Sequence, residues 1–109
     1  YDYSSAIPNF KYMEDQVTAD SVDFDRTVVC MHAGPYSEQF NNNVAKPFEY
    51  YVRMFPNVLF CTKAHDHSLT VDSPFNDDVT YYGSDCAKHR NYLLFTITPH
   101  EYNYEVIYF

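Results

Sequence analysis

The hydrophobic and polar positions of this chain switch between helical and extended spacing, and they predict two helices and five strands. Apolar residues recur three and four positions apart over residues 10–19 and 44–54, which predicts two amphipathic helices. Runs rich in Val, Phe, Tyr and Ile predict strands over 27–32, 58–62, 79–82, 92–98 and 102–109. The last two runs are separated by three residues, so they predict a tight hairpin.

The succession of strand, helix and strand over residues 27–62 predicts a parallel βαβ unit with a right-handed crossover. Asn43 is the expected cap of the connecting helix. The first strand ends at His32, and His65 follows the second strand. The carboxyl ends of parallel neighbours lie on one edge of a sheet, where ligand sites of open α/β sheets form. We therefore expect these histidines to lie close together.

Three histidines follow the two strand ends, namely His32, His65 and His67, and they are the candidate metal ligands. Zinc, manganese and iron all accept neutral imidazole, and Asp66 adds an oxygen ligand or an outer partner. Residues i and i+2 of an extended chain point to opposite faces. His65 and His67 can therefore serve one site only if a turn intervenes, or they serve two metals. A polar loop with solvated histidines is the alternative.

The other chemically interesting residues carry weaker signals. His89 lies between Lys88 and Arg90, which predicts a surface residue. His100 lies in the expected hairpin turn and is predicted to be structural or solvated. Cys30 precedes His32 by two positions inside an apolar strand, where a reduced thiol behaves as a small hydrophobic group. No residue is assigned a catalytic role from these patterns.

Composition narrows the classes of function. The chain has 109 residues, enough for one domain, and a formal net charge of −8, which repels nucleic acid and anionic membranes. Two glycines leave little room for a glycine-rich phosphate loop. Three cysteines without a Cys-x-x-Cys pair disfavour a zinc knuckle or a disulfide framework. No apolar run is long enough to span a bilayer, so we expect a soluble protein of the cytoplasm or periplasm.

Two stretches resemble signature blocks of the calcineurin-like metallophosphoesterase family. Residues 28–35, Val-Val-Cys-Met-His-Ala-Gly-Pro, resemble the block in which a strand ends in a metal-binding His before a Pro-containing loop. Residues 60–67, Phe-Cys-Thr-Lys-Ala-His-Asp-His, resemble the Gly-His-x-His block. The resemblance implies an α/β (α+β) fold with a mixed β-sheet and flanking helices, half of a four-layer αββα sandwich. It also implies that His32 and His65 ligate one metal and His67 another.

The family's earlier blocks, Asp-x-His, Gly-Asp-x-x-Asp and Gly-Asn-His-Asp/Glu, do not occur in these 109 residues. The resemblance therefore implies the C-terminal portion of a metal-dependent phosphohydrolase that acts on a phosphoester small molecule. We expect it to be weakly active or inactive alone, to hold at most one of the family's two divalent ions (Zn, Mn or Fe), and to self-associate through its exposed sheet. A non-catalytic, truncated oligomeric binding module, with or without one structural metal, is the alternative. A mononuclear three-histidine zinc hydrolase is a third reading.

Overall fold

The computed structural model describes residues 8–18, 26–55, 57–75 and 78–109. The elements are, in chain order, α1 (Phe10–Thr18), β1 (Thr27–Cys30), the 3₁₀ helix η1 (Asn42–Val44), α2 (Ala45–Met54), β2 (Val58–Lys63), β3 (Thr70–Asp72), β4 (Tyr81–Gly83), the 3₁₀ helix η2 (Ala87–His89), β5 (Asn91–Ile97) and β6 (Tyr102–Tyr108). Ala19, the expected end of the first helix, lies outside the described residues. No described helix has both the length and the apolar character that crossing a membrane requires.

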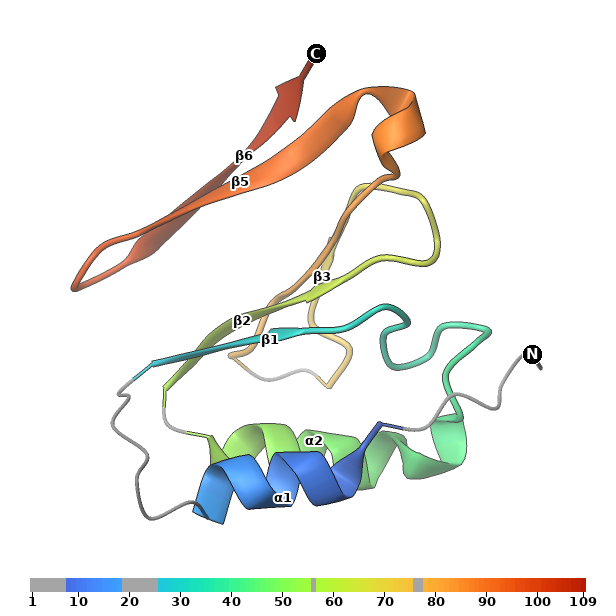
Figure 1. The fold of residues 1–109 in the computed structure, drawn as a ribbon, viewed down its shortest axis with the longest axis vertical. Coiled ribbons are helices and arrows are strands. Elements are labelled where there is room, and N and C mark those ends of the chain that lie inside the picture. Colours follow the sequence, from blue (N-terminus) through green and yellow to red (C-terminus); the bar gives the residue numbers. More distant parts are fainter. Residues whose placement is uncertain (1–7, 19–25, 56, 76–77) are drawn as a thin grey trace.

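These elements form three layers (Figure 1). The helices α1 and α2 lie on one face of a four-stranded sheet, and the β5–β6 hairpin lies on the opposite face. The sheet has the order β1-β2-β4-β3, with β1, β2 and β4 parallel and β3 antiparallel to β4. The described residues therefore form a mixed α+β structure with a mixed sheet and two flanking helices, which confirms the expected fold class.

Helix α2 connects the neighbouring parallel strands β1 and β2, which confirms the predicted βαβ unit. Pairing continues past the strand ends, because the amide of Met31 donates to the carbonyl of Thr62 at 3.0 Å. The amide of Ala64 in turn donates to the carbonyl of His32 at 2.8 Å. The backbone just beyond both strands is thus held by the same hydrogen-bond ladder as the sheet.

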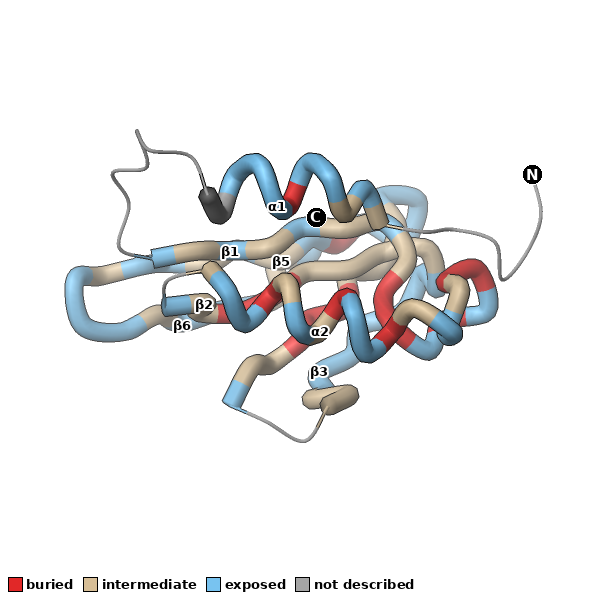
Figure 2. Tube along the Cα trace, turned by 90° about the horizontal axis from the view of Figure 1, so that it is seen from below, coloured by how far each residue is buried: buried red, intermediate tan, exposed pale blue. Residues whose placement is uncertain are grey.

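The central strands β2 and β4 are covered on both faces. Cys61 and Tyr81 pair across the strands and are buried in the cluster beneath the helices, whereas Phe60 and Tyr82 contact the hairpin. Strands buried on both faces have continuous apolar sequences without alternation, as 58–62 does. Figure 2 shows the helices with their outer surfaces exposed and buried positions turned toward the sheet. The buried cluster on the helix side consists of Met13, Phe40, Ala45, Phe48, Val52, Cys61 and Tyr81.

Aromatic rings join the hairpin to the sheet. The ring of Phe60 stacks on that of Phe95, with centroids 4.2 Å apart, and lies 4.7 Å from that of Tyr102. The ring of Tyr82 lies 4.6 Å from that of Tyr104, which pairs with Phe95 across the hairpin. The predicted hairpin is therefore confirmed, and the rings of Phe95 and Tyr104 lie on its face that meets the sheet.

Strand β3 was not predicted from the sequence. Its three residues are all exposed, so they have neither the alternation nor the apolar run that indicates a strand. Its close pairing with β4 depends on Gly83, where an added Cβ atom would lie 2.0 Å from the hydroxyl oxygen of Thr70. A contact of this kind between distant segments leaves no local signal.

The cap expected at Asn43 is wrong. The side chain of Asn41 instead accepts a hydrogen bond from the amide of Asn43 at 3.1 Å, and so begins η1, which leads into α2. The three consecutive asparagines are chemically equivalent as caps, so only the backbone conformation selects among them. Helix α1 begins in the same way, because the side chain of Asn9 accepts from the amide of Tyr12 at 3.0 Å.

We predict that Phe60→Ala lowers the free energy of unfolding by about 3–5 kcal/mol, because it removes a ring enclosed by three others. Leu94→Ala is the matched control. Leu94 lies on the far side of the same hairpin and is 43% exposed, so we expect a cost of about 0.5 kcal/mol. Urea unfolding measures both, and equal losses would contradict the packing of the hairpin on the sheet.

A second prediction concerns alkaline pH. Burial, and then the 2.9 Å hydrogen bond with the Tyr102 hydroxyl, raises the pKa of Tyr82 above its ordinary value of 10.0. Unfolded Tyr82 therefore loses its proton at lower pH than folded Tyr82, and stability falls as pH rises above the unfolded value. The limiting slope is about 1.4 kcal/mol per pH unit. Urea unfolding between pH 8 and about 11 should show a shallower fall for Tyr82→Phe, and identical slopes would refute the prediction.

Candidate functional site

The carboxyl ends of β1 and β2 bring His32 and His65 together. Nε2 of His32 lies 3.2 Å from Nδ1 of His65, and the ring centroids are 5.1 Å apart. Two imidazole nitrogens bound to one ion at about 2.1 Å lie about 3.0–3.4 Å from each other, depending on the coordination angle. The observed separation fits two ligands of a single divalent ion. The predicted convergence of these two histidines is therefore present in the fold.

The other nitrogen of His65 faces a carboxylate. Nε2 of His65 lies 3.5 Å from Oε1 of Glu38, whose side chain is 67% exposed. Metal-binding histidines commonly place the second ring nitrogen against a carboxylate, which orients the ring and selects the tautomer. With the proton on Nε2, Nδ1 of His65 is left as a lone pair directed at His32. Glu38 escaped the sequence analysis because only the folded 34–40 loop brings it to His65.

The chain turns sharply at this point. His65 and His67 both have left-handed backbone conformations, with φ of 54° and 53°, and the amide of Asp66 donates to the carbonyl of Ala64 at 2.5 Å. Left-handed residues other than glycine cost roughly 1–3 kcal/mol each and cluster at functional sites. This is the turn that the His-x-His spacing needs in order to avoid sending its two rings to opposite faces.

His67 does not join the pair. It is exposed, and the described residues contain one group of three potential ligand atoms within 4.8 Å of one another, to which none of the three histidines belongs. The structure therefore brings together two of the three predicted ligands. This arrangement does not place all three imidazoles around a single ion. It is compatible with His65 and His67 binding different ions.

A tight loop between β1 and α2 supports the site from below the strand ends. Gly34 is buried, and an added Cβ atom there would lie 2.6 Å from Cδ of Lys63, so a side chain at position 34 would require the Lys63 side chain to move. The hydroxyl of the nearly buried Ser37 lies 3.5 Å from Oδ1 of Asp66. The loop thus contacts the histidine turn directly.

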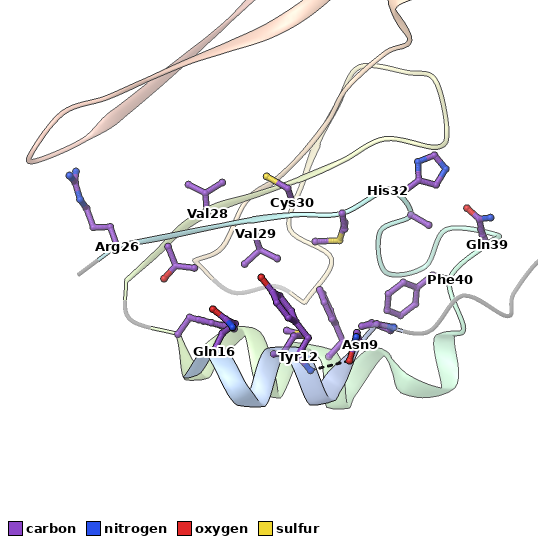
Figure 3. A pocket seen from close by; sticks show the side chains of 17 residues that line it. Asn9, Tyr12, Gln16, Arg26, Val28, Val29, Cys30, His32, Gln39 and Phe40 are labelled. Atoms are coloured by element: carbon purple, nitrogen blue, oxygen red, sulfur yellow. Dashed lines mark hydrogen bonds between the residues drawn. The ribbon is translucent and has the colours of Figure 1, made fainter. Parts of the chain in front are cut away.

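A pocket of about 700 Å³ extends from the histidine edge along β1 and α1 (Figure 3). Its walls are mainly apolar, and His32 and Gln39 line one end. Gln39 is 2% exposed, and its Oε1 has no hydrogen-bond partner. An apolar pocket with a few polar groups at one end is typical of a ligand site. β1 is the outer strand of the described sheet, so this pocket follows a sheet edge.

The remaining sequence predictions have mixed outcomes. Cys30 is exposed rather than packed as a small hydrophobic group, and it lies on β1, the outer strand of the described sheet; Cys61, on the central strand β2, is the buried thiol. His100 is exposed in the final turn, as predicted. His89 is at the surface, as predicted, with 53% of its side chain exposed, but its partners were not foreseen.

Those partners form a second cluster of potential ligands, Asp85, Cys86 and His89. Nδ1 of His89 lies 2.7 Å from Oδ1 of Asp85 and 3.6 Å from the sulfur of Cys86. The contact with His89, together with hydrogen bonds from Asn91 and the Cys86 amide, lowers the pKa of Asp85 despite partial burial. The Asp-Cys-x-x-His spacing was the available signal, and the basic neighbours of His89 obscured it.

Comparison with known proteins returns no relative of this chain. No family model, no curated protein and no solved structure matches it. The similarity of the two histidine blocks to the calcineurin-like metallophosphoesterases therefore stays a prediction, and the site geometry carries the functional proposal below.

The left-handed turn generates a stability prediction for the metal-free protein. We expect the His67→Gly variant to have a free energy of unfolding about 1 kcal/mol higher than that of His67→Ala, because the Cβ atom of alanine is strained at a positive φ. His100 is the control, since it is exposed and has no positive φ, and there alanine should be at least as stable as glycine. Urea unfolding of the four variants gives the comparison. The same order at both positions would rule out the left-handed conformation of His67.

Proposed function

We propose that this chain supplies histidine ligands to the metal centre of a phosphohydrolase, as the C-terminal portion of a calcineurin-like metallophosphoesterase. The observation that carries the proposal is the 3.2 Å separation of His32 Nε2 and His65 Nδ1 at the ends of two parallel strands. Two imidazoles leave most positions of a divalent ion open. Open positions are what a catalytic ion needs and a structural ion does not.

The chemistry of such a centre suits a phosphoester. A divalent ion activates water at neutral pH and neutralises charge on the phosphoryl oxygens. The chain's own contribution is to hold two imidazoles at a fixed separation and to orient the His65 ring through Glu38. The protein's net charge of −8 opposes phosphate binding elsewhere on its surface, so anion binding should depend on the ion. His67, exposed on the same turn, is available to a second ion.

Activity of the chain alone is expected to be weak or absent. Among the described residues no carboxylate forms a group of three close ligand atoms with the histidine pair, and the family's two-metal chemistry uses a bridging carboxylate. The half of a four-layer sandwich implied by the sequence likewise belongs to this proposal, since the three layers observed are compatible with it.

A second candidate, a non-catalytic binding module, is favoured by one observation. The 700 Å³ pocket follows the outer strand β1, and Val28 and Cys30 are exposed along that strand. An edge strand with an apolar surface is suited to pairing with another chain, including a second copy. In that case the protein would associate through this edge, and metal binding would be dispensable for association.

The metal proposal is tested with Mn²⁺, which disfavours thiolate ligands and so avoids the Cys86 cluster. We expect His32→Ala and His65→Ala to weaken Mn²⁺ binding by at least about 10-fold, since each removes one of two ligands. His67→Ala and the surface control His100→Ala should bind as the unaltered chain does. The loss of the free Mn²⁺ electron paramagnetic resonance signal measures binding.

The same samples test the link to phosphate. Inorganic phosphate should show ³¹P line broadening with the Mn²⁺-loaded chain beyond that caused by free Mn²⁺, and His65→Ala should abolish the excess. Equal Mn²⁺ binding by the unaltered chain and by His65→Ala would refute the proposed metal centre. Metal binding without excess broadening, combined with dimerisation in size-exclusion chromatography, would favour the binding module.

A further inference from the structure

The segment from Asp85 to Asn91 concentrates metal-binding side chains away from the histidine pair. It follows β4, at the same edge of the sheet, and contains a carboxylate, a thiol and an imidazole whose ligand atoms all lie within 4.8 Å of one another. The short helix η2 sets the spacing, because residues three apart in a 3₁₀ helix lie one above the other. Cys86 caps this helix and His89 ends it, so their side chains share a side.

The distances distinguish a metal site from an activated thiol. In a catalytic relay the nucleophile and the carboxylate use different nitrogens of the imidazole. Here Asp85 and Cys86 both face Nδ1 of His89, at 2.7 Å and 3.6 Å. Such an arrangement cannot pass a proton from sulfur to carboxylate through the ring. Three ligand atoms within 4.8 Å of one another are instead what a single ion could hold.

The separations also suit one particular class of ion. Tetrahedral Zn²⁺ with bonds of about 2.05 Å to nitrogen and about 2.3 Å to sulfur holds those two atoms about 3.6 Å apart. The observed distance between Nδ1 and Sγ is 3.6 Å. The carboxylate oxygen needs to withdraw from 2.7 Å to about 3.3 Å from the nitrogen, as expected when a hydrogen bond is replaced by two metal bonds. A thiolate excludes magnesium and calcium as preferred ions.

An independent observation comes from Asn91. This residue is 4% exposed, and its amide nitrogen donates to Oδ2 of Asp85 at 3.2 Å. Its amide oxygen has no hydrogen-bond partner. A buried acceptor without a donor is costly, and a water molecule on the ion's fourth position is a donor of the kind it lacks. Asn91 thus serves as an outer partner that orients Asp85.

We propose that Asp85, Cys86 and His89 form a zinc site with one open position, supported by Asn91. The site would fasten the end of β4 to the start of β5, and so stabilise the passage of the chain from the sheet to the hairpin. This proposal is independent of the histidine pair, which contains no sulfur. The two sites can therefore be told apart by their spectra.

Cobalt provides the test, because Co²⁺ occupies zinc sites and gives a thiolate charge-transfer band in the near ultraviolet. When Co²⁺ is added to the reduced chain after a chelator has stripped other metals, we expect this band to appear. Added Zn²⁺ should then displace Co²⁺ and remove the band. Cys86→Ser should lose the band, and His89→Ala should weaken Co²⁺ binding by about 100-fold or more. Cys30→Ser and His100→Ala, which change an exposed thiol and an exposed histidine outside the cluster, should leave it unchanged.

A band that persists in Cys86→Ser, or no thiolate band in the unaltered chain, would overturn the site. A measurement on the unaltered chain guards against misfolding of the variants. Zn²⁺ should slow alkylation of Cys86 at least about 10-fold but leave alkylation of Cys30 unchanged, as resolved by peptide mass mapping. Equal protection of the two thiols, or of neither, would count against the proposal.

Discussion

Parallel pairing of β1 with β2 is the constraint on which the rest of the structure depends. Parallel neighbours need a crossover, which α2 provides, and the crossover covers one face of the sheet. The pairing also places both carboxyl ends on one edge. Hydrogen bonds from Met31 to Thr62 and from Ala64 to His32 extend it to the histidines themselves. Sheet formation thus brings the backbones of His32 and His65 close together, and the turn that follows β2 sets the position of the His65 ring.

The opposite face of the sheet explains the large aromatic content. Phe60 and Tyr82 project away from the helices and need a cover, which the β5–β6 hairpin supplies through Phe95 and Tyr104. To reach that position the chain leaves β4 at the same edge as the histidines, where the amide of Ser84 donates to the carbonyl of Lys63. Because the hairpin covers this face, the 85–91 segment that leads to it passes the edge of the sheet that carries the candidate sites.

The two candidate sites differ in the way they are assembled, and this suggests different roles. The histidine pair joins residues 33 positions apart, lies at the end of a large pocket and leaves an ion mostly open. The Asp85 cluster is formed within seven residues by a single turn, contains a thiol and has a buried outer partner in Asn91. Open coordination beside a pocket suits chemistry, whereas a local thiolate site suits the fastening of a chain segment.

The sequence by itself determined the βαβ unit, the final hairpin and the strand-end position of His32 and His65. Each of these follows from periodicity and chain order, which are local properties. It did not predict β3, the choice of Asn41 as cap, the position of Glu38 or the exposure of Cys30. All four depend on segments distant in the chain or on backbone dihedral angles, as the contact of Thr70 with Gly83 illustrates. Which ligands meet follows from the tertiary structure, because the register of β1 with β2 brings His65 to His32, whereas His67, two residues further along the turn, stays exposed.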